Sequence, residues 1–168
     1  MVAVGHGDLT PATLELVESE LRARMERLGE GVTGLVRAGA GLPVAFGRAV
    51  RAAGRRLVVL LPAQQSVPAT LPGSDRAGAG ELLMLAEQVR LVAMDPADRG
   101  ACIGADERLV GASNGVLAVW DGSPSTGRDA TAHLVAYARA RGIPVDIVWP
   151  DGARRAAHGT GPGFTAAG

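Results

Sequence analysis

Short apolar runs alternate with amphipathic segments along the first 150 residues of the chain. The run Val2–Val4 is followed by a stripe of apolar residues at spacings of three and four: Leu14, Val17, Leu21, Met25 and Leu28. This periodicity is typical of an amphipathic helix, and Thr10 and Pro11 suit its N-cap and first position. The chain is therefore predicted to begin with a strand and a helix, which ends at Gly29.

The same alternation predicts the later elements. Strands are expected at residues 31–36, 56–61, 91–94, 116–120 and 144–149, and helices at 43–53, 81–89, 98–112 and between 127 and 144. Residues 62–80 are rich in Pro, Gly and Ser, and we interpret them as a long loop that is either a functional lid or disordered. The last residues, 157–168, have the composition of a frayed tail.

Strands that alternate with helices form mostly parallel sheets with helices on both faces. We therefore expect an α/β fold, a Rossmann-like three-layer sandwich, with one domain over residues 1–150 and a C-terminal tail over residues 151–168. Ligands of such folds bind beyond the carboxyl ends of the strands. The search for a site therefore concentrates on the loops that follow the strands.

Composition restricts the chemistry. All 17 basic residues are arginine, so the chain has no lysine for a Walker A loop, a Schiff base or a general base. Acidic residues also number 17, and this balance argues against a nucleic-acid-binding surface. The single cysteine excludes an internal disulfide and a multi-cysteine zinc site, and the three histidines show no metal-ligand spacing. We expect no metal site.

The sequence also gives an expectation about location. No apolar run approaches the roughly 20 residues that a membrane span needs. The N-terminus MVAVGHGDL has neither a basic region nor a signal-like apolar core. We therefore expect a cytoplasmic protein with no membrane partner.

The segment Gly115–Pro150 carries most of the functional argument, because it reads as strand, polar loop, helix and strand. At such a junction the unpaired N–H groups and the dipole of the helix favour an anionic ligand. Asp121 could accept hydrogen bonds from ribose hydroxyls, or it merely caps the loop. The remaining candidates supply hydroxyls and glycine flexibility near a phosphate, unless they form an ordinary capped turn: Gly122, Ser123, Ser125, Gly127 and Thr131.

Two earlier strands end in further candidates that should reach the same edge of the sheet. Gly5 and His6 follow the first strand, where the imidazole either contacts a ligand or is a structural loop residue. Gly39 and Gly41 follow the second strand, where they either let backbone amides approach a phosphate or form a plain tight turn. Arg37, just before them, could supply a charge-assisted contact to the ligand.

Four stretches together resemble the SLOG superfamily, the Rossmann-like domains related to Lonely-guy phosphoribohydrolases and DprA. They are GHGDL at residues 5–9, GLVRAGAG at 34–41, AVWDG at 118–122 and GRDATAHLVAYA at 127–138. The resemblance covers about residues 1–150. It implies a nucleotide or nucleotide-derived ligand and a homodimeric assembly, which is frequent in the superfamily. We expect no other cofactor.

The residues that carry catalysis in this superfamily are replaced here. The Lonely-guy motif has a Thr followed by two Glu, and Thr131 matches the Thr, but His133 and Leu134 occupy the Glu positions. Nucleoside deoxyribosyltransferases, with a related pattern, place their catalytic Glu at the position of Leu134. Leucine can neither attack a ribose carbon nor stabilise an oxocarbenium ion. The resemblance thus implies a ligand cradle without its usual catalytic carboxylate.

Three functions remain open at this point. The first is a nucleotide-binding or nucleotide-sensing domain of SLOG type. The second is an N-glycosidic hydrolase or transferase acting on a nucleotide, with Asp121, Asp8 or Glu81 as its acid. The third is an interaction module that has lost its ligand, in which side chains fill the pocket or the glycine loops do not converge. Binding is the function we favour, and enzymatic activity is left open.

Overall fold

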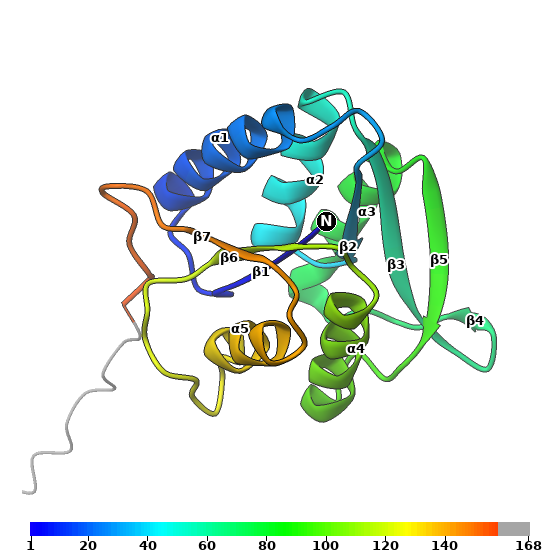
Figure 1. Cartoon of the computed structure of the whole chain (residues 1–168). Coiled ribbons are helices and arrows are strands. Elements are labelled where there is room, and N and C mark those ends of the chain that lie inside the picture. Colours follow the sequence, from blue (N-terminus) through cyan, green and yellow to red (C-terminus); the bar gives the residue numbers. More distant parts are fainter. Residues whose placement is uncertain (158–168) are drawn as a thin grey trace, which may run out of the picture.

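A computed structural model describes residues 1–157, and these form one mixed sheet enclosed by helices (Figure 1). The strand order is β4-β3-β2-β1-β6-β7, with β5 beside β3, and every pairing is parallel except that of β3 with β4. The strands are β1 (Val2–Gly5), β2 (Thr33–Arg37), β3 (Arg56–Gln64), β4 (Val67–Pro68), β5 (Gln88–Ala93), β6 (Val116–Val119) and β7 (Val145–Val148).

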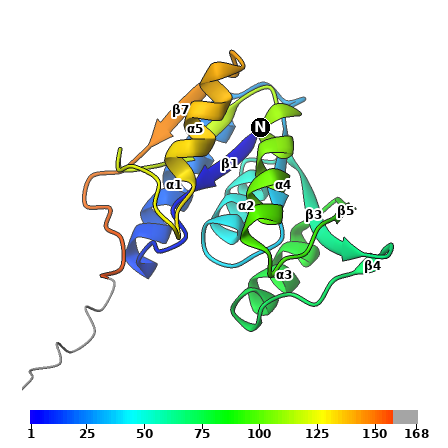
Figure 2. The same ribbon diagram turned by 90° about the horizontal axis from the view of Figure 1, so that it is seen from below.

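The helices form the two outer layers. They are α1 (Pro11–Arg27), α2 (Leu42–Ala52), α3 (Gly73–Leu85), α4 (Arg99–Gly111) and α5 (Thr131–Ala140). One core packs α1, α2 and α3 against one face of the sheet, around the fully buried Phe46. A second core packs α4 and α5 against the other face, around Val110 and Val135 (Figure 2). The predicted Rossmann-like three-layer fold is confirmed.

The topology identifies one position on the sheet as special. The chain leaves β1 toward β2 and β3 on one side, and later returns to β6 and β7 on the other side. β1 and β6 are adjacent parallel strands, paired from Val2 with Val116 to Gly5 with Val119. The loops that follow these two strands therefore start side by side and run in opposite directions. A crevice at such a topological switch point is where open parallel sheets bind their ligands.

The predicted long loop at residues 62–80 is wrong. Residues up to Gln64 continue β3, Val67 and Pro68 form the short β4, and α3 begins at Gly73. The glycines of this stretch suggested irregular chain, but Gly78 is needed inside α3 because that helix packs directly on the backbone after β2. The predicted helix at 81–89 is wrong at both ends, since α3 begins at Gly73 and stops at Leu85, and β5 begins at Gln88.

The chain beyond β7 packs on the domain as far as the structure describes it. Arg154 exchanges hydrogen bonds with the Thr13 hydroxyl at the start of α1, and Arg155 forms a β-bridge with Leu9. The predicted frayed tail at 157–168 lies, apart from its first residue, outside the described residues. No helix within residues 1–157 has the length and apolar character needed to cross a bilayer.

Candidate functional site

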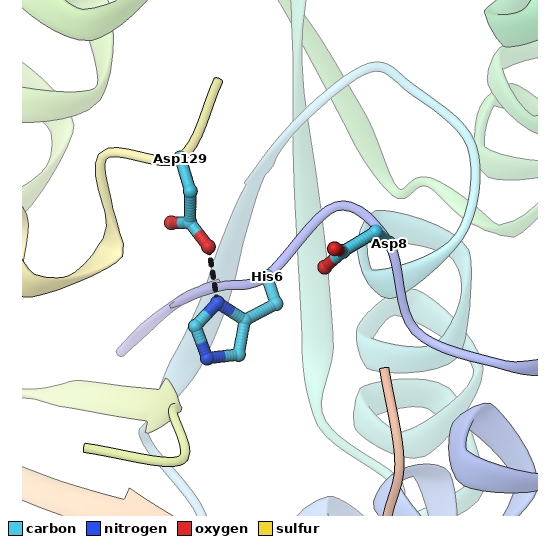
Figure 3. Close-up of side chains that lie close together, drawn as sticks. All are labelled: His6, Asp8 and Asp129. Atoms are coloured by element: carbon cyan, nitrogen blue, oxygen red, sulfur yellow. Dashed lines mark hydrogen bonds and ion pairs between the residues drawn. The ribbon is translucent and has the colours of Figure 1, made fainter. Parts of the chain in front are cut away.

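His6 stands at the centre of the switch point, in the loop directly after β1. Its side chain is 1% exposed and lies between two carboxylates from the loop after β6. The imidazole Nδ1 bonds Asp129 Oδ2 (Figure 3). On the other side of the ring, Nε2 lies 2.9 Å from Asp121 Oδ1. The indole of Trp149 meets the imidazole edge-on, with 5.7 Å between ring centroids. His6 therefore joins the two loops whose divergence creates the crevice.

The contacts of His6 depend on its protonation state: the neutral ring leaves Asp121 Oδ1 facing an unprotonated Nε2, and the charged ring leaves the Asp121 N–H without this acceptor. In the neutral ring, Nδ1–H donates to Asp129 and Nε2 accepts from the backbone N–H of Asp121, 3.2 Å away. In the charged ring, both nitrogens donate to carboxylates. In either state the ring orientation is fixed, so His6 has no rotational freedom with which to follow a ligand.

Arg155 closes this cluster from the C-terminal segment. Its guanidinium makes a two-pronged pair with Asp8 at 2.9 and 3.0 Å, and it also contacts Asp129 Oδ2 at 3.1 Å. It donates to the Ser123 hydroxyl at 3.1 Å and lies 3.7 Å from Asp121 Oδ2. One arginine thus connects the β1 loop, the β6 loop and the chain after β7.

The electrostatics of the cluster keep its carboxyl groups ionised. Burial alone raises the pKa of Asp121, but the hydrogen bonds from Ser123 and the interaction with His6 outweigh it and lower the pKa to about 2. For Asp129 the effect of burial is likewise exceeded by hydrogen bonds from Thr131 and His6, and the pKa is lowered. Both groups are therefore anionic at neutral pH.

A cleft of about 240 Å³ opens between the loops after β1 and β2. Its polar lining consists of His6, Arg37, Asp75 and Asp106, and its floor includes Gly39 and Leu134. Arg37 is held by Asp106 through two bonds of 2.8 and 3.0 Å. The Ala40 N–H donates to Asp75 Oδ1 at 3.2 Å. The cleft thus offers two carboxylates together with one arginine that is already paired.

A second, wider hollow lies on the other side of Gly7, which lines both spaces. It is bounded by Asp8 and Asp129 and by three successive residues of the β6 loop: Thr126, Gly127 and Arg128. Arg155 forms its remaining wall. The two spaces lie to either side of the β1 loop, so an extended ligand could lie across that loop and use both.

Most polar groups of the predicted phosphate loop after β6 form hydrogen bonds within that loop or to the start of α5. The Ser125 hydroxyl accepts from His133 N at 2.9 Å, and Asp129 accepts from Thr131 N at 2.8 Å, so both cap α5. The Asp121 carboxylate accepts from Ser123 N at 2.9 Å. The Thr131 hydroxyl is buried with no partner in hydrogen-bond geometry among the described residues, although it lies near enough to lower the pKa of Asp129.

The predicted glycines differ in what the structure requires of them. A Cβ on Gly5 would come within 2.6 Å of the Val119 carbonyl oxygen, so only glycine allows β1 and β6 to approach. Gly41 and Gly122 have φ values of 70° and 87°, which favour glycine. A Cβ on Gly39 would make ordinary contacts with Pro43 and Asp75, and one on Gly127 would meet nothing within 4 Å. Gly39 lines the cleft and Gly127 the second hollow.

His6, Asp8 and Asp129 each bring a ligand-type atom within 4.8 Å of the others, an arrangement that could hold a metal ion. Figure 3 shows that Asp129 and Asp8 come from different loops. Sequence reasoning expected no metal site, and it could not find this grouping because 123 residues separate His6 from Asp129. In the described part of the chain the Arg155 guanidinium contacts both carboxylates, so a cation at this point would compete with it.

The two residues that the resemblance aligns with catalytic glutamates, His133 and Leu134, lie in different surroundings. The His133 imidazole is half exposed and pairs with Glu107 at 2.6 Å, while Leu134 is buried at the floor of the cleft. Of the acids considered for a glycosidase, Asp121 and Asp8 belong to the His6 cluster. Glu81 pairs with Arg48 on an exposed surface of the α2–α3 layer and lies outside both spaces.

Sequence reasoning missed five charged residues of the site, and Arg128 of the second hollow is one of them. Asp129 could have been suspected, because Asp commonly stands just before a helix. Arg155 follows the end of β7 and should have been assigned to the same sheet edge rather than to the tail. Asp75 and Asp106 lie on α3 and α4, and nothing local in the sequence indicates that they face the cleft.

Comparison of the chain with protein-family models and with curated proteins finds no match to either.

Proposed function

We propose that this protein binds a nucleotide or a nucleotide derivative at the switch point, as a SLOG-type binding or sensing domain that lacks the usual catalytic glutamate. The observation that carries the proposal is the pair of open spaces on either side of Gly7, at the edge where an open parallel sheet binds ligands. The close approach required at Gly5 and the fixed ring of His6 support it, because they give the intervening loop one defined shape.

The arrangement of charges favours binding over catalysis. The three carboxylates nearest the switch point are Asp8, Asp121 and Asp129, and each is engaged with Arg155 or His6. A carboxyl group with a lowered pKa, as in Asp121 and Asp129, is a poor general acid at neutral pH because it carries no proton to donate. The apolar Leu134 takes the place at which the resemblance expects a nucleophile.

An N-glycosidic hydrolase or transferase remains the second candidate, and one observation favours it. Asp8 and Asp129 line the wider hollow, so an ionised carboxylate is present where a developing positive charge on a ribose ring could be stabilised. The two functions differ in their products. A sensing domain returns its nucleotide intact, whereas a glycosidase releases the free base.

The third alternative, an interaction module, expected side chains that fill the pocket or glycine loops that do not converge. The cleft is open, with a volume of about 240 Å³. Gly39 lines this cleft and Gly127 lines the second hollow, so the two glycine loops do not meet in one space, and Gly7 is the glycine that lines both. An open space of this kind at the carboxyl edge of the sheet supports a small-molecule ligand rather than a remnant of a lost site.

A thermal-shift screen tests the proposal. The panel is AMP, ADP, ATP, NAD, ADP-ribose, cyclic nucleotides and deoxynucleosides. A ligand at about 100 times its Kd stabilises the fold by roughly 2.7 kcal/mol, a shift that is easily seen. Chromatography of the same mixtures after incubation separates sensor from glycosidase. Absence of any shift at millimolar concentration would refute nucleotide binding and support the interaction module.

A further inference from the structure

The turn after β2 resembles a phosphate cradle, but an anion of the protein itself already bonds to it. The backbone there runs Gly39-Ala40-Gly41 into the start of α2, and Ala40 N–H points to Asp75 Oδ1 at 3.2 Å. A carboxylate therefore takes the position at which an amide of this turn would meet a phosphate oxygen.

The position of Asp75 depends on the close packing of α3. Gly78 lies one helical turn after Asp75, and a Cβ there would stand 2.8 Å from both the Ala40 Cα and the Gly39 carbonyl oxygen. Because those neighbours are backbone atoms, they cannot move aside as a flexible side chain would. The absent side chain at Gly78 thus allows the first turn of α3 to lie directly on the turn after β2.

The other charges of the cleft strengthen this exclusion of phosphate. Asp106 contributes a second carboxylate. Arg37, the arginine among the described residues that lines the cleft, donates two hydrogen bonds to it. With His6 neutral, Arg37, Asp75 and Asp106 sum to one negative charge. A phosphate in the cleft would therefore meet like charge at short range, whereas hydroxyl or amino groups would find carboxylate acceptors.

The hollow on the other side of Gly7 has a more favourable balance for an anion. Its two arginines, Arg128 and Arg155, offset Asp8 and Asp129. Arg128 is exposed, and its guanidinium has no partner among residues 1–157. A phosphate placed beside Gly127 and Arg128 would gain a charge-assisted contact without displacing an internal ion pair.

We propose that Asp75 excludes phosphate from the turn after β2, so that the uncharged nucleoside part of the ligand lies in the cleft and its phosphate lies beside Gly127 and Arg128. This inference rests on the proposed function and specifies the direction in which the ligand binds, from its nucleoside in the cleft to its phosphate in the second hollow. The cleft then selects for groups that donate hydrogen bonds to Asp75 and Asp106. The turn itself contributes shape rather than phosphate affinity.

Amide chemical shifts of the isotope-labelled full chain test the direction without any mutation. The probes are inorganic phosphate, the four nucleosides of AMP, GMP, CMP and UMP, and those monophosphates. We expect phosphate to shift the amides of Gly127 and Arg128, and a bound nucleoside to shift those of Gly39, Ala40 and Gly41. Phosphate that shifts Ala40 instead, with the nucleoside acting on Arg128, would overturn the direction and leave nucleotide binding intact.

Substitution of Asp75 provides the second arm. Asp75→Asn removes the negative charge and replaces a carboxylate acceptor with a neutral amide. We therefore expect nucleoside affinity to fall at least tenfold, and we expect phosphate to begin to shift the Ala40 amide. Asp146→Asn on β7 is the matched control, because the same exchange at an exposed residue should leave both affinities unchanged. Unchanged nucleoside affinity in Asp75→Asn, with phosphate still failing to shift Ala40, would overturn the proposal. Failure of every nucleoside and monophosphate to bind the wild type would overturn the proposed function itself, and this inference with it.

Discussion

The imidazole of His6 and the carboxylate of Asp129 meet in a buried hydrogen bond, although 123 residues separate them in the chain. His6 follows β1 and Asp129 precedes α5, so this bond joins the two loops of the switch point. Their pairing, with Asp121 on the other side of the ring, gives the site a shape that does not depend on a ligand. The consequences for stability can be measured separately from those for binding.

Loss of the His6 ring should destabilise the fold strongly. His6→Ala leaves Asp129 and Asp121 facing a cavity without their common partner, and we expect a loss of about 2–4 kcal/mol in the free energy of unfolding. Urea denaturation measures it. His133→Ala is the control, since that ring lies half exposed against Glu107 and should change stability by less than about 0.5 kcal/mol. Equal effects of the two substitutions would contradict a structural role for the His6 cluster.

The lowered pKa of Asp121 predicts how stability depends on pH. A group whose pKa falls from about 3.9 in the unfolded chain to about 2 in the fold stabilises the protein above the unfolded value. That contribution is lost as the pH falls through the folded value. The wild type should therefore lose stability between about pH 4 and pH 2, and Asp121→Asn should show a shallower decline in this range. Parallel acid-unfolding curves for the two proteins would show that Asp121 is not the group responsible.

Gly5 and Gly7 form a matched pair with opposite expectations. An alanine Cβ at Gly5 would stand 2.6 Å from a backbone oxygen of β6, and separating the strands should cost about 1–3 kcal/mol. An alanine Cβ at Gly7 meets nothing within 4 Å, so Gly7→Ala should leave stability within about 1 kcal/mol of the wild type. Thermal unfolding of both variants suffices, and a well-tolerated Gly5→Ala would mean that the strand ends are more loosely packed than described.

Arg155 should hold the chain after β7 against the β1 loop, because its side chain bonds Asp8. The neighbouring Arg154 uses only its backbone, which bonds the Thr13 hydroxyl at the start of α1. Arg155→Gln is expected to lower stability by about 1–3 kcal/mol, because three carboxylates lose their shared cation. It should also speed amide hydrogen exchange at Leu9 and Thr10. Arg154→Gln keeps the backbone bonds and should change neither quantity. An Arg155→Gln variant with unchanged exchange would show that the segment is held by its backbone only.

The sequence predicted the ends of β1, β2 and β6 to within one residue, but it did not predict which residues contact one another beyond those ends. His6 and Asp121 were both identified because each follows an apolar run, and parallel strands bring such positions to one edge. Asp129 and Arg155 were not identified, although each has a local signal in its place before a helix or after a strand, because their contacts span 123 and 147 residues and cannot be read from the sequence. The polar network was therefore found only in part, although the layers of the fold were predicted correctly.

The error at α3 has a different origin. Glycine normally argues against helix, and residues 73–80 contain three of them. Here Gly78 is tolerated because tertiary packing against the backbone of Gly39 and Ala40 needs a residue without a side chain. The first part of α3, which sequence reasoning assigned to a loop, is also the part that carries Asp75 to the cleft, so one local misreading hid the start of an element and a site residue.

The most direct test of the central claim is calorimetric titration of the best nucleotide from the panel into wild type, Gly39→Val and Gly80→Val. A Cβ at Gly39 makes only ordinary contacts, and Gly39 lines the cleft, so a valine there should narrow it. Gly80 on α3 has open space around it and lines neither the cleft nor the second hollow. The account predicts saturable binding to wild type and to Gly80→Val, with affinity reduced at least tenfold in a folded Gly39→Val. Equal affinity of all three proteins would contradict a nucleotide site at the carboxyl edge of the sheet.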